Sequence, residues 1–428
     1  MKPFIVASTR PELIKLAPVL REFDSNGVEY IFITTGQHYD AALFHKFVDD
    51  LELKKPDHDI ETGSGSQAYQ TSDALLKLEK LMMKEKPDIV IAEGDTNSVL
   101  STALAAVKLH QPFAHVESGL RSFDMHMPEE VNRIVADHCS QVLFAPTDGA
   151  GLNLLNEGIP PDRIHIVGNT VVDAVQQNIR IAKSKSAIEL PTEYALLTLH
   201  RPENVDSRKG LSNIVEALLK LEFEVLFPCH PRTMKMLKKF GLFKKLGEQS
   251  SIKIIAPLGY FDFIHAMSRA KVVLTDSGGI QEESLALHVP CLTLRDTTER
   301  PESVTSGGNI LVGTDPKNII EKLEMVLGDK KLYSRMKRAK NPFGDGKSGK
   351  RIVKILLDLH RDGKLAFSAP DFKGGFWKRR FVAVDSSIAG KRIKDLEMTV
   401  FKLMVDGEEK YPHGDTVLKK GQLIEIRS

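Results

Sequence analysis

Carboxylate side chains lie at three points of the sequence where they could act as acids or bases. Asp95 follows the apolar run 89–92, Glu117 follows the run 113–116, and Glu129 opens the helical stretch that comes next. Neighbouring carboxylates raise one another's pKa toward values that suit proton transfer. A helix cap or a rim ion pair explains any one of them alone, but the three together favour acid–base catalysis.

Histidine and cationic side chains follow other apolar runs. His200 and His230 each follow a predicted strand, and two histidines at successive strand ends indicate a functional role more strongly than one does. Arg10 and Lys15 follow the run 4–7, and Arg133 lies one turn after Glu129. We expect these groups to face the same cleft as the carboxylates.

An anion-binding motif follows the apolar run 272–275. Ser277, Gly278 and Gly279 precede a helix, whose first backbone N–H groups and positive dipole end could hold a diphosphate. Glu283, one turn later, could reach ribose hydroxyls. Arg300 follows the next strand and could clamp a phosphate with two hydrogen bonds.

The elements that must position these residues alternate between short apolar strands and amphipathic helices, a pattern typical of a parallel sheet covered on both faces. Because ligands of such sheets bind at the carboxyl ends of the strands, the motifs should meet at one edge. The predicted strands of the first half are 4–7, 30–34, 89–92, 113–116, 142–145 and 164–167. Those of the second half are 195–199, 225–228, 253–255, 272–275 and 291–294.

The fold class predicted from this pattern is α/β, with two Rossmann-like domains and a small β-rich C-terminal module. The first domain should span residues 1–170 and be joined by a final helix at 347–362, and the second should span 171–346. A linker is expected at 363–380, because Gly, Pro and Ser occur there without periodicity. The module should then occupy 381–428, where alternating stretches at 401–405 and 423–426 favour strands.

Composition excludes several classes of protein. The chain has 428 residues, 42% hydrophobic and 27% charged, with a net charge of +2, which is ordinary for a globular protein and gives no broad field for a polyanion. We therefore expect no nucleic-acid partner.

No segment suits a signal peptide or a membrane span, and three widely spaced cysteines suit reduced thiols without metal, so the expected location is cytoplasmic. The stretch 63–68 only loosely matches a dinucleotide fingerprint and follows no apolar strand.

Taken together, the motifs strongly resemble those of the non-hydrolysing UDP-N-acetylglucosamine 2-epimerase family. The resemblance spans about residues 1–362, and its longest motifs are 276–283 and 296–302. It implies the B-type glycosyltransferase fold and the interconversion of UDP-N-acetylglucosamine and UDP-N-acetylmannosamine. The family's route eliminates UDP together with the C2 proton to give a 2-acetamidoglucal, and UDP then adds back with the opposite C2 configuration.

The resemblance also implies roles for single residues. Asp95, Glu117, Glu129 and His200 are the acid–base candidates, and which of them takes the proton is left open. The remaining site residues would bind the UDP-sugar: Arg10, Lys15, Arg133, His230, Ser277, Gly278, Gly279, Glu283 and Arg300. No cofactor and no metal is implied, and a homodimer is expected.

Two regions depart from the family pattern. Members can bind a second UDP-N-acetylglucosamine as an activator at a Gln-His motif, which Gln37 and His38 match, but Tyr39 and Asp40 differ from the usual Arg and Gln. The tail resembles the ligand-binding C-terminal module of potassium-transport regulators, carried by 387–391, 395–396 and 414–421. That resemblance implies a regulatory or dimerising role with a small-molecule effector, and a plain structural appendage is the alternative.

Other functions remain open at this point. The hydrolysing relative releases UDP and free N-acetylmannosamine, a glycosyltransferase could use the same scaffold, and a related UDP-sugar could be the substrate. A nucleotide-sugar sensor would bind its ligand with negligible turnover, and the full set of carboxylates argues against it.

Overall fold

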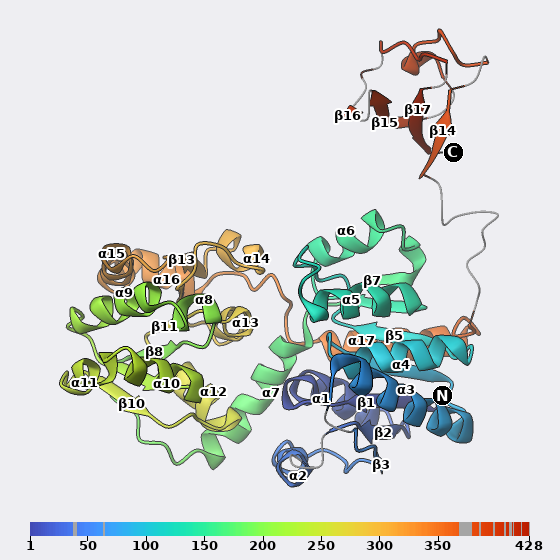
Figure 1. The fold of residues 1–428 in the computed structure, drawn as a ribbon. Coiled ribbons are helices and arrows are strands. Elements are labelled where there is room, and N and C mark those ends of the chain that lie inside the picture. Colours follow the sequence, from blue (N-terminus) through green and yellow to red (C-terminus); the bar gives the residue numbers. More distant parts are fainter. Residues whose placement is uncertain are drawn as a thin grey trace. The chain divides into compact units, whose positions relative to one another are not determined.

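A computed structural model describes residues 1–36, 41–62, 65–367, 379–384, 387–396, 399–405, 408–410, 413, 415–420 and 422–427. The described residues form three sheets, two of them parallel and one antiparallel. The parallel sheets and most of their helices belong to one compact unit, formed by Met1–Asn153 and Ile164–Ala366 (Figure 1). The antiparallel sheet belongs to the other unit.

The first parallel sheet has the strand order β3-β2-β1-β4-β5-β6-β7. The five inner strands β2, β1, β4, β5 and β6 are buried on both faces because helices cover both, which accounts for their continuous apolar runs, whereas the edge strands β3 and β7 are partly exposed. The elements in chain order are β1 (Pro3–Ala7), α1 (Arg10–Ser25), β2 (Ile31–Thr34), α2 (Ala41–Asp50), β3 (His58–Asp59), α3 (Gln67–Glu85), β4 (Ile89–Glu93), α4 (Asn97–Lys108), β5 (Phe113–Val116), α5 (Pro128–Cys139), β6 (Val142–Ala145), α6 (Asp148–Asn156), the 3-10 helix η2 (Pro161–Arg163), β7 (Ile164–Ile166) and α7 (Thr170–Lys185).

The second parallel sheet has the order β10-β9-β8-β11-β12-β13 and its own apolar core. Its elements are β8 (Ala195–Thr198), α8 (Pro202–Val205), α9 (Arg208–Leu219), β9 (Val225–Pro228), α10 (Pro231–Lys239), α11 (Leu242–Gly247), β10 (Ile252–Ile255), α12 (Tyr260–Arg269), β11 (Val272–Thr275), α13 (Gly278–Ala286), β12 (Cys291–Thr293), α14 (Pro301–Thr305), β13 (Asn309–Leu311), α15 (Pro316–Gly328) and α16 (Lys330–Lys337). We refer to the two sheets with their helices as the first and second lobes.

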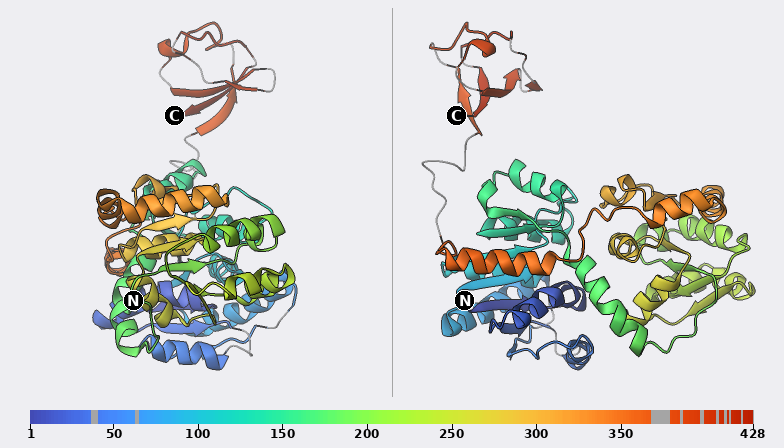
Figure 2. Two further views of the ribbon diagram at one scale, coloured as in Figure 1. Left: turned by 90° about the vertical axis from the view of Figure 1, so that its left-hand side faces the viewer. Right: turned by 180° about the vertical axis from the view of Figure 1, so that it is seen from behind.

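The chain passes between the lobes twice. It enters the second lobe through α7, which packs on α1 of the first lobe and on α12 and α13 of the second. It returns before α17 (Ser348–Arg361), which lies against α1 and buries Ile352, Val353 and Leu356 in the core of the first lobe (Figure 2). The backbone N–H of Asn169 donates a hydrogen bond of 2.6 Å to the carbonyl of Phe343, so the two crossings run side by side.

The C-terminal module contains an antiparallel sheet with the order β14-β17-β15-β16. Its elements are β14 (Arg379–Ala383), the 3-10 helix η3 (Ile393–Asp395), β15 (Thr399–Val405), β16 (Glu408–Lys410) and β17 (Leu423–Arg427). It has a small apolar core of its own, made of Val384, Val400, Leu403, Leu418 and Ile424.

The α/β class and the two parallel sheets agree with the fold predicted from the sequence. The predicted strands 113–116, 142–145, 225–228 and 272–275 coincide with β5, β6, β9 and β11. Strands β3 and β13 are absent from the prediction because they span two and three residues and carry no long apolar run. The domain boundaries stay a prediction. Gln37, His38, Tyr39, Asp40, Gly63 and Ser64 lie outside the described residues, as does most of the predicted linker.

Candidate active site

The carboxyl ends of β1, β4 and β5 bring charged side chains of the first lobe together. These strands are adjacent and parallel, so the residues that follow them emerge at one edge of the sheet. Helix α1 begins there with a capping box, in which Thr9 accepts from the backbone N–H of Glu12 and the carboxylate of Glu12 accepts from the N–H of Thr9. Glu12 is therefore a structural cap, and the next turn carries Lys15 into the site.

Lys15 bridges two carboxyl groups. Its Nζ lies 2.5 Å from Oε1 of Glu93 and 2.7 Å from Oε2 of Glu117. The side chain of Glu93 is fully buried, and those of Glu117 and Lys15 are 11% and 21% exposed. Glu117 has a φ of 68°, a left-handed conformation that is uncommon for a residue with a side chain and often marks a functional site.

The charges of this group extend to the second lobe. Burial alone would raise the pKa of Glu117, but the positive charges of Lys15 and Arg300 lower it to about 2, so Glu117 is ionised at neutral pH. Arg300 donates from Nε to the buried carboxylate of Glu282, which also accepts a 2.8 Å hydrogen bond from Asn169. The positive charge of Arg300 in the second lobe therefore acts on Glu117 in the first, which places Lys15, Glu117 and Arg300 in one electrostatic cluster.

Asp276 organises the predicted anion-binding end of the second lobe. This fully buried carboxylate follows β11 and accepts from the backbone N–H groups of His200 and Arg201, at 3.1 Å and 3.0 Å, which ties the residues after β8 to those after β11. The imidazole of His200 lies 3.1 Å from the same carboxylate and is half exposed. His200 is thus held at the strand end where the sequence predicts it.

The N-terminus of α13 is open at its glycines. Ser277 is the N-cap residue, and a Cβ added to Gly279 would meet no atom within 4 Å, which leaves room for a ligand to approach the backbone N–H groups. Glu283 lies on the second turn of α13. Burial raises its pKa to about 8, and the negative charge of Glu282 adds to this effect.

Asp95 belongs to a network with α5. Its carboxylate accepts from the guanidinium of Arg133, which also donates a 3.0 Å bond to Glu130. Glu130 in turn accepts 2.9 Å bonds from the backbone N–H groups of Ser122 and Phe123. Glu129 is exposed on the first turn of α5. Its neighbour Glu130 makes the contacts just described. The structure thus brings Asp95 to Arg133, and the role of Glu129 stays a prediction.

Two further candidates lie at helix starts. Arg10 is the exposed first residue of α1. His230 caps α10, and its Nδ1 accepts a 3.3 Å bond from the backbone N–H of Arg232. Their predicted contacts with substrate remain predictions. Gly36, next to the Gln-His motif, lines a cavity of about 330 Å³ in the first lobe.

The sequence-based candidates omit Glu93 and Glu282, although both contact the central cations. The signal for Glu93 is a carboxylate at the last position of a buried strand, where burial is costly unless the group is paired. In the described part of the chain, no group of three or more His, Cys, Asp or Glu side chains is arranged to hold a metal ion. None of the described helices combines the length and the apolar character needed to cross a membrane.

Comparisons with known proteins agree with the fold. Two lobes, each built on a parallel sheet covered by helices, define the B-type glycosyltransferase fold. The family model described as UDP-N-acetylglucosamine 2-epimerase matches residues 21–357. The chain therefore belongs to the UDP-N-acetylglucosamine 2-epimerase family, whose members are isomerases.

Individual relatives cover the two lobes almost completely. The UDP-N-acetylglucosamine 2-epimerase of Methanocaldococcus jannaschii is 47% identical over 83% of this chain and 99% of its own length. A crystal structure of that enzyme in complex with UDP-GlcNAc and UDP has a TM-score of 0.72 and covers 84% of this chain and 100% of that one. The UDP-2,3-diacetamido-2,3-dideoxy-D-glucuronate 2-epimerase of Pseudomonas aeruginosa is 38% identical over 84% of this chain and 100% of its own length.

Proposed function

We propose that the protein interconverts UDP-N-acetylglucosamine and UDP-N-acetylmannosamine by inverting C2 of the sugar. The observation that carries this proposal is the cluster in which Lys15, Glu117 and Arg300 join the strand ends of the two lobes. A carboxylate and two cations at one place suit a substrate with a sugar on one side and a diphosphate on the other. The identity to epimerases over both lobes supports the same reaction.

The proposed reaction proceeds by elimination and re-addition, because a C2–H bond with no adjacent carbonyl is too weakly acidic for direct removal and return of the proton. A base takes the C2 proton, the electrons of that bond form the C1=C2 double bond, and UDP leaves with the electrons of the C1–O bond. UDP then adds to C1 of the 2-acetamidoglucal, and C2 receives a proton on the opposite face. This route needs a base, a proton donor and cations for the departing diphosphate.

The residues of this chain can fill these roles. The proposed acid–base residues are Asp95, Glu117, Glu129 and His200, and Glu117, which is ionised, suits the role of a base rather than that of the proton donor. Arg300 and the N-terminus of α13 would stabilise the diphosphate as negative charge develops on it. Glu283, held protonated near neutral pH, could hydrogen bond the ribose hydroxyls. The other proposed sugar and phosphate contacts are Arg10, Lys15, Arg133, His230, Ser277, Gly278 and Gly279.

A single labelling experiment tests the reaction. The purified protein is incubated with UDP-N-acetylglucosamine in deuterated water, and the products are followed by NMR. The proposal predicts intact UDP-sugars of both C2 configurations with deuterium at C2. Free N-acetylmannosamine would identify a hydrolysing enzyme instead, and the absence of exchange without an acceptor would favour a transferase or a sensor.

A related UDP-sugar is the second candidate substrate, because the Pseudomonas aeruginosa relative is named for a diacetamido glucuronate. Running the labelling experiment in parallel with that UDP-sugar decides between the two. The favoured substrate is the one with the higher kcat/KM for deuterium exchange.

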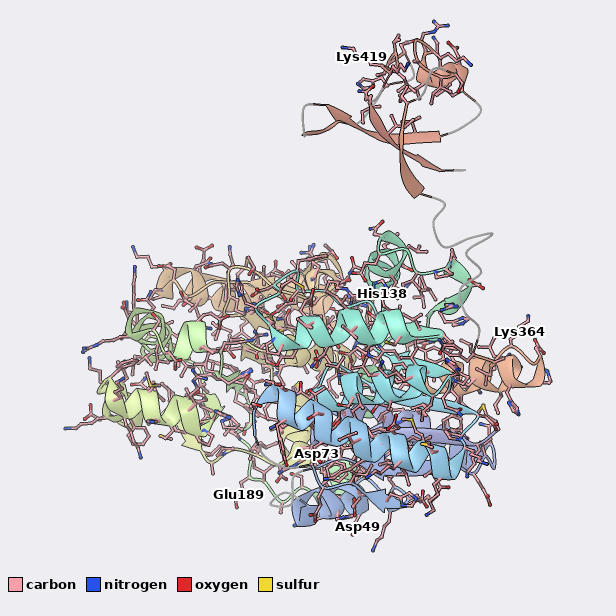
Figure 3. The ribbon with its side chains drawn as sticks, turned by 45° about the vertical axis from the view of Figure 1, so that its right-hand side comes forward. Asp49, Asp73, His138, Glu189, Lys364 and Lys419 are labelled. Atoms are coloured by element: carbon pink, nitrogen blue, oxygen red, sulfur yellow. The ribbon has the colours of Figure 1, made fainter. Side chains whose placement is uncertain are left out.

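A homodimer is proposed from the surface of α3. Tyr69, Leu76 and Met83 are 52%, 55% and 61% exposed and lie seven residues apart, which aligns them in one stripe on the helix. Figure 3 shows α3, which carries Asp73, in the helical layer that also contains α5 with His138. A second copy of the chain could cover such a stripe. Leu76→Glu should shift the sedimentation of a dimer toward the monomer, and an unchanged mass would place any interface elsewhere.

The C-terminal module is proposed to bind a small-molecule effector. Its separate antiparallel sheet and core support an independent unit, and its motifs resemble the ligand-binding module of potassium-transport regulators. Added ATP, UDP or potassium ions should change the epimerase rate of the full chain to a different extent from the rate of a chain that ends at residue 366. Equal responses of both chains would favour a structural appendage.

The cysteines support the proposed cytoplasmic location. Cys139, Cys229 and Cys291 are free thiols, and the last two are buried. Free thiols persist in a reducing compartment, whereas exported proteins commonly pair their cysteines.

A further inference from the structure

Glu93 is a buried carboxyl group that the proposed reaction does not use. It is the last residue of β4, its side chain is fully buried, and it contacts Lys15 at 2.5 Å. Neither of its oxygens has a hydrogen bond of good geometry among the described residues. An ionised carboxylate in such a position loses its hydration and gains too few hydrogen bonds in return.

With Glu283 of the same cluster protonated near neutral pH, the remaining charges around Glu93 balance only if one more carboxyl group carries a proton. Lys15 and Arg300 supply two positive charges, whereas Glu93, Glu117 and Glu282 could supply three negative ones. Glu117 and Glu282 each have the charge of a cation beside them, and Glu282 also accepts a bond from Asn169. Glu93 is the least exposed of the three, and the cation that it contacts, Lys15, also pairs with Glu117.

The contact between Glu93 and Glu117 also requires a proton. Both carboxyl groups contact the same ammonium group, Nζ of Lys15, at 2.5 Å for Glu93 and 2.7 Å for Glu117, which brings them side by side. Two ionised carboxylates are both acceptors and repel each other, but a protonated carboxyl group can donate to an ionised one. Burial, supported by the negative charge of Glu117 and opposed by Lys15, holds the pKa of Glu93 well above its usual range.

We propose that Glu93 is a neutral carboxylic acid in the resting enzyme and donates a hydrogen bond to the carboxylate of Glu117. Glu93 is then a positioning residue for Glu117. The donated bond would fix the direction of the Glu117 carboxylate, whose backbone already adopts a left-handed conformation. The effect on turnover rests on the proposed epimerase function, whereas the protonation state does not.

Infrared difference spectra test the protonation state without any turnover. At pH 7, subtracting the spectrum of Glu93→Gln from that of the full wild-type chain should reveal the carbonyl stretch of a protonated carboxylic acid. The matched control is Glu216→Gln, which removes an exposed carboxylate paired with Lys220 and should remove carboxylate bands alone. If the Glu93→Gln difference contains carboxylate bands alone, Glu93 is ionised and the proposal is overturned.

Kinetics of two variants test the positioning role. Glutamine is neutral and can donate a hydrogen bond, so Glu93→Gln should keep kcat within about threefold of wild type. Glu93→Leu lacks the donor, and the loss of a hydrogen bond to a charged group should lower kcat about 10- to 100-fold with little change in KM. Equal kcat values for the two variants would overturn the positioning role, even if wild type epimerises and the infrared band is present. Because Glu93→Gln changes neither shape nor the proposed charge, its spectrum remains informative if Glu93→Leu fails to fold.

Discussion

His115 donates a hydrogen bond from Nε2 to the carbonyl oxygen of Gly94 across 2.7 Å, and this bond ties two segments of the site together. Gly94 lies between Glu93 and Asp95, and His115 lies two residues before Glu117. The other ring nitrogen, Nδ1, lies 2.6 Å from Asp137. The acidic side chains after β4 and β5 are therefore held in one register by a histidine buried between them.

Removing the carboxylate of Asp137 should destabilise the fold and disorder the site. This fully buried group contacts His115, accepts a 3.1 Å bond from the N–H of Gly119, and forms a 2.7 Å ion pair with Arg121. Asp137→Asn leaves the buried guanidinium of Arg121 without its counter-charge, and we expect a loss of about 3–5 kcal/mol in the free energy of unfolding. Urea denaturation measures this loss. A change below about 1 kcal/mol, the scale of an exposed ion pair, would contradict it.

The pH dependence of the same group has a definite sign. Burial alone would raise the pKa of Asp137, but His115 and Arg121 outweigh it and lower the pKa below its ordinary value of 3.8. The stability that Asp137 contributes is therefore fully present above the unfolded-state pKa and is lost as the pH falls through the folded-state pKa. Acid unfolding of Asp137→Asn should lack this contribution.

Asp95→Asn should lower the rate of deuterium exchange at C2 by about 10²- to 10⁴-fold if Asp95 transfers a proton. The amide can still contact Arg133, so the affinity for UDP should change little. Exchange is followed by NMR and UDP binding by calorimetry. Glu129→Gln serves as a comparison on the exposed turn of α5, and retained turnover in either variant would remove that residue from the acid–base candidates.

The raised pKa of Glu283 predicts that the folded protein loses stability as the pH rises. Its ordinary pKa is 4.5, and in the folded protein burial raises it to about 8. Between these values the unfolded chain releases a proton that the folded chain keeps, so the free energy of unfolding should fall with increasing pH. Melting temperatures of wild type and Glu283→Gln at pH 5 and pH 8 test this expectation. The wild-type difference should be larger, and identical differences would contradict the assignment.

A chain that ends at residue 366 should fold and retain the epimerase activity of the full chain. The two lobes have their own cores, and the M. jannaschii relative matches them over 99% of its own length. Circular dichroism and the deuterium-exchange assay check both parts of the prediction. An aggregated or inactive product would mean that the lobes depend on the C-terminal module.

The sequence predicts the strand ends well because each buried strand forms an apolar run that stops at a polar motif. Asp95, Glu117 and Ser277 are visible in this way. The pairing of Lys15 with Glu93 is not visible, because it depends on how far a side chain from α1 reaches across the sheet. The contact of Glu130 with Arg133 is hidden in the sequence for a similar reason, since adjacent residues of a helix differ by 100° in direction and only packing decides which one faces inward.

The paired crossings between the lobes restrict how the site can open. The backbone of Asn169 is bonded to that of Phe343, and a Cβ on Gly168 would come within 3.2 Å of Gly344, so the two connections touch. Two adjacent connections would act as a hinge. Rotation of the lobes about the axis through both connections would leave them unstrained, whereas rotation about another axis would strain both. Substrate entry and product release would then follow a single angular coordinate, along which the distance between Glu117 and Arg300 changes directly.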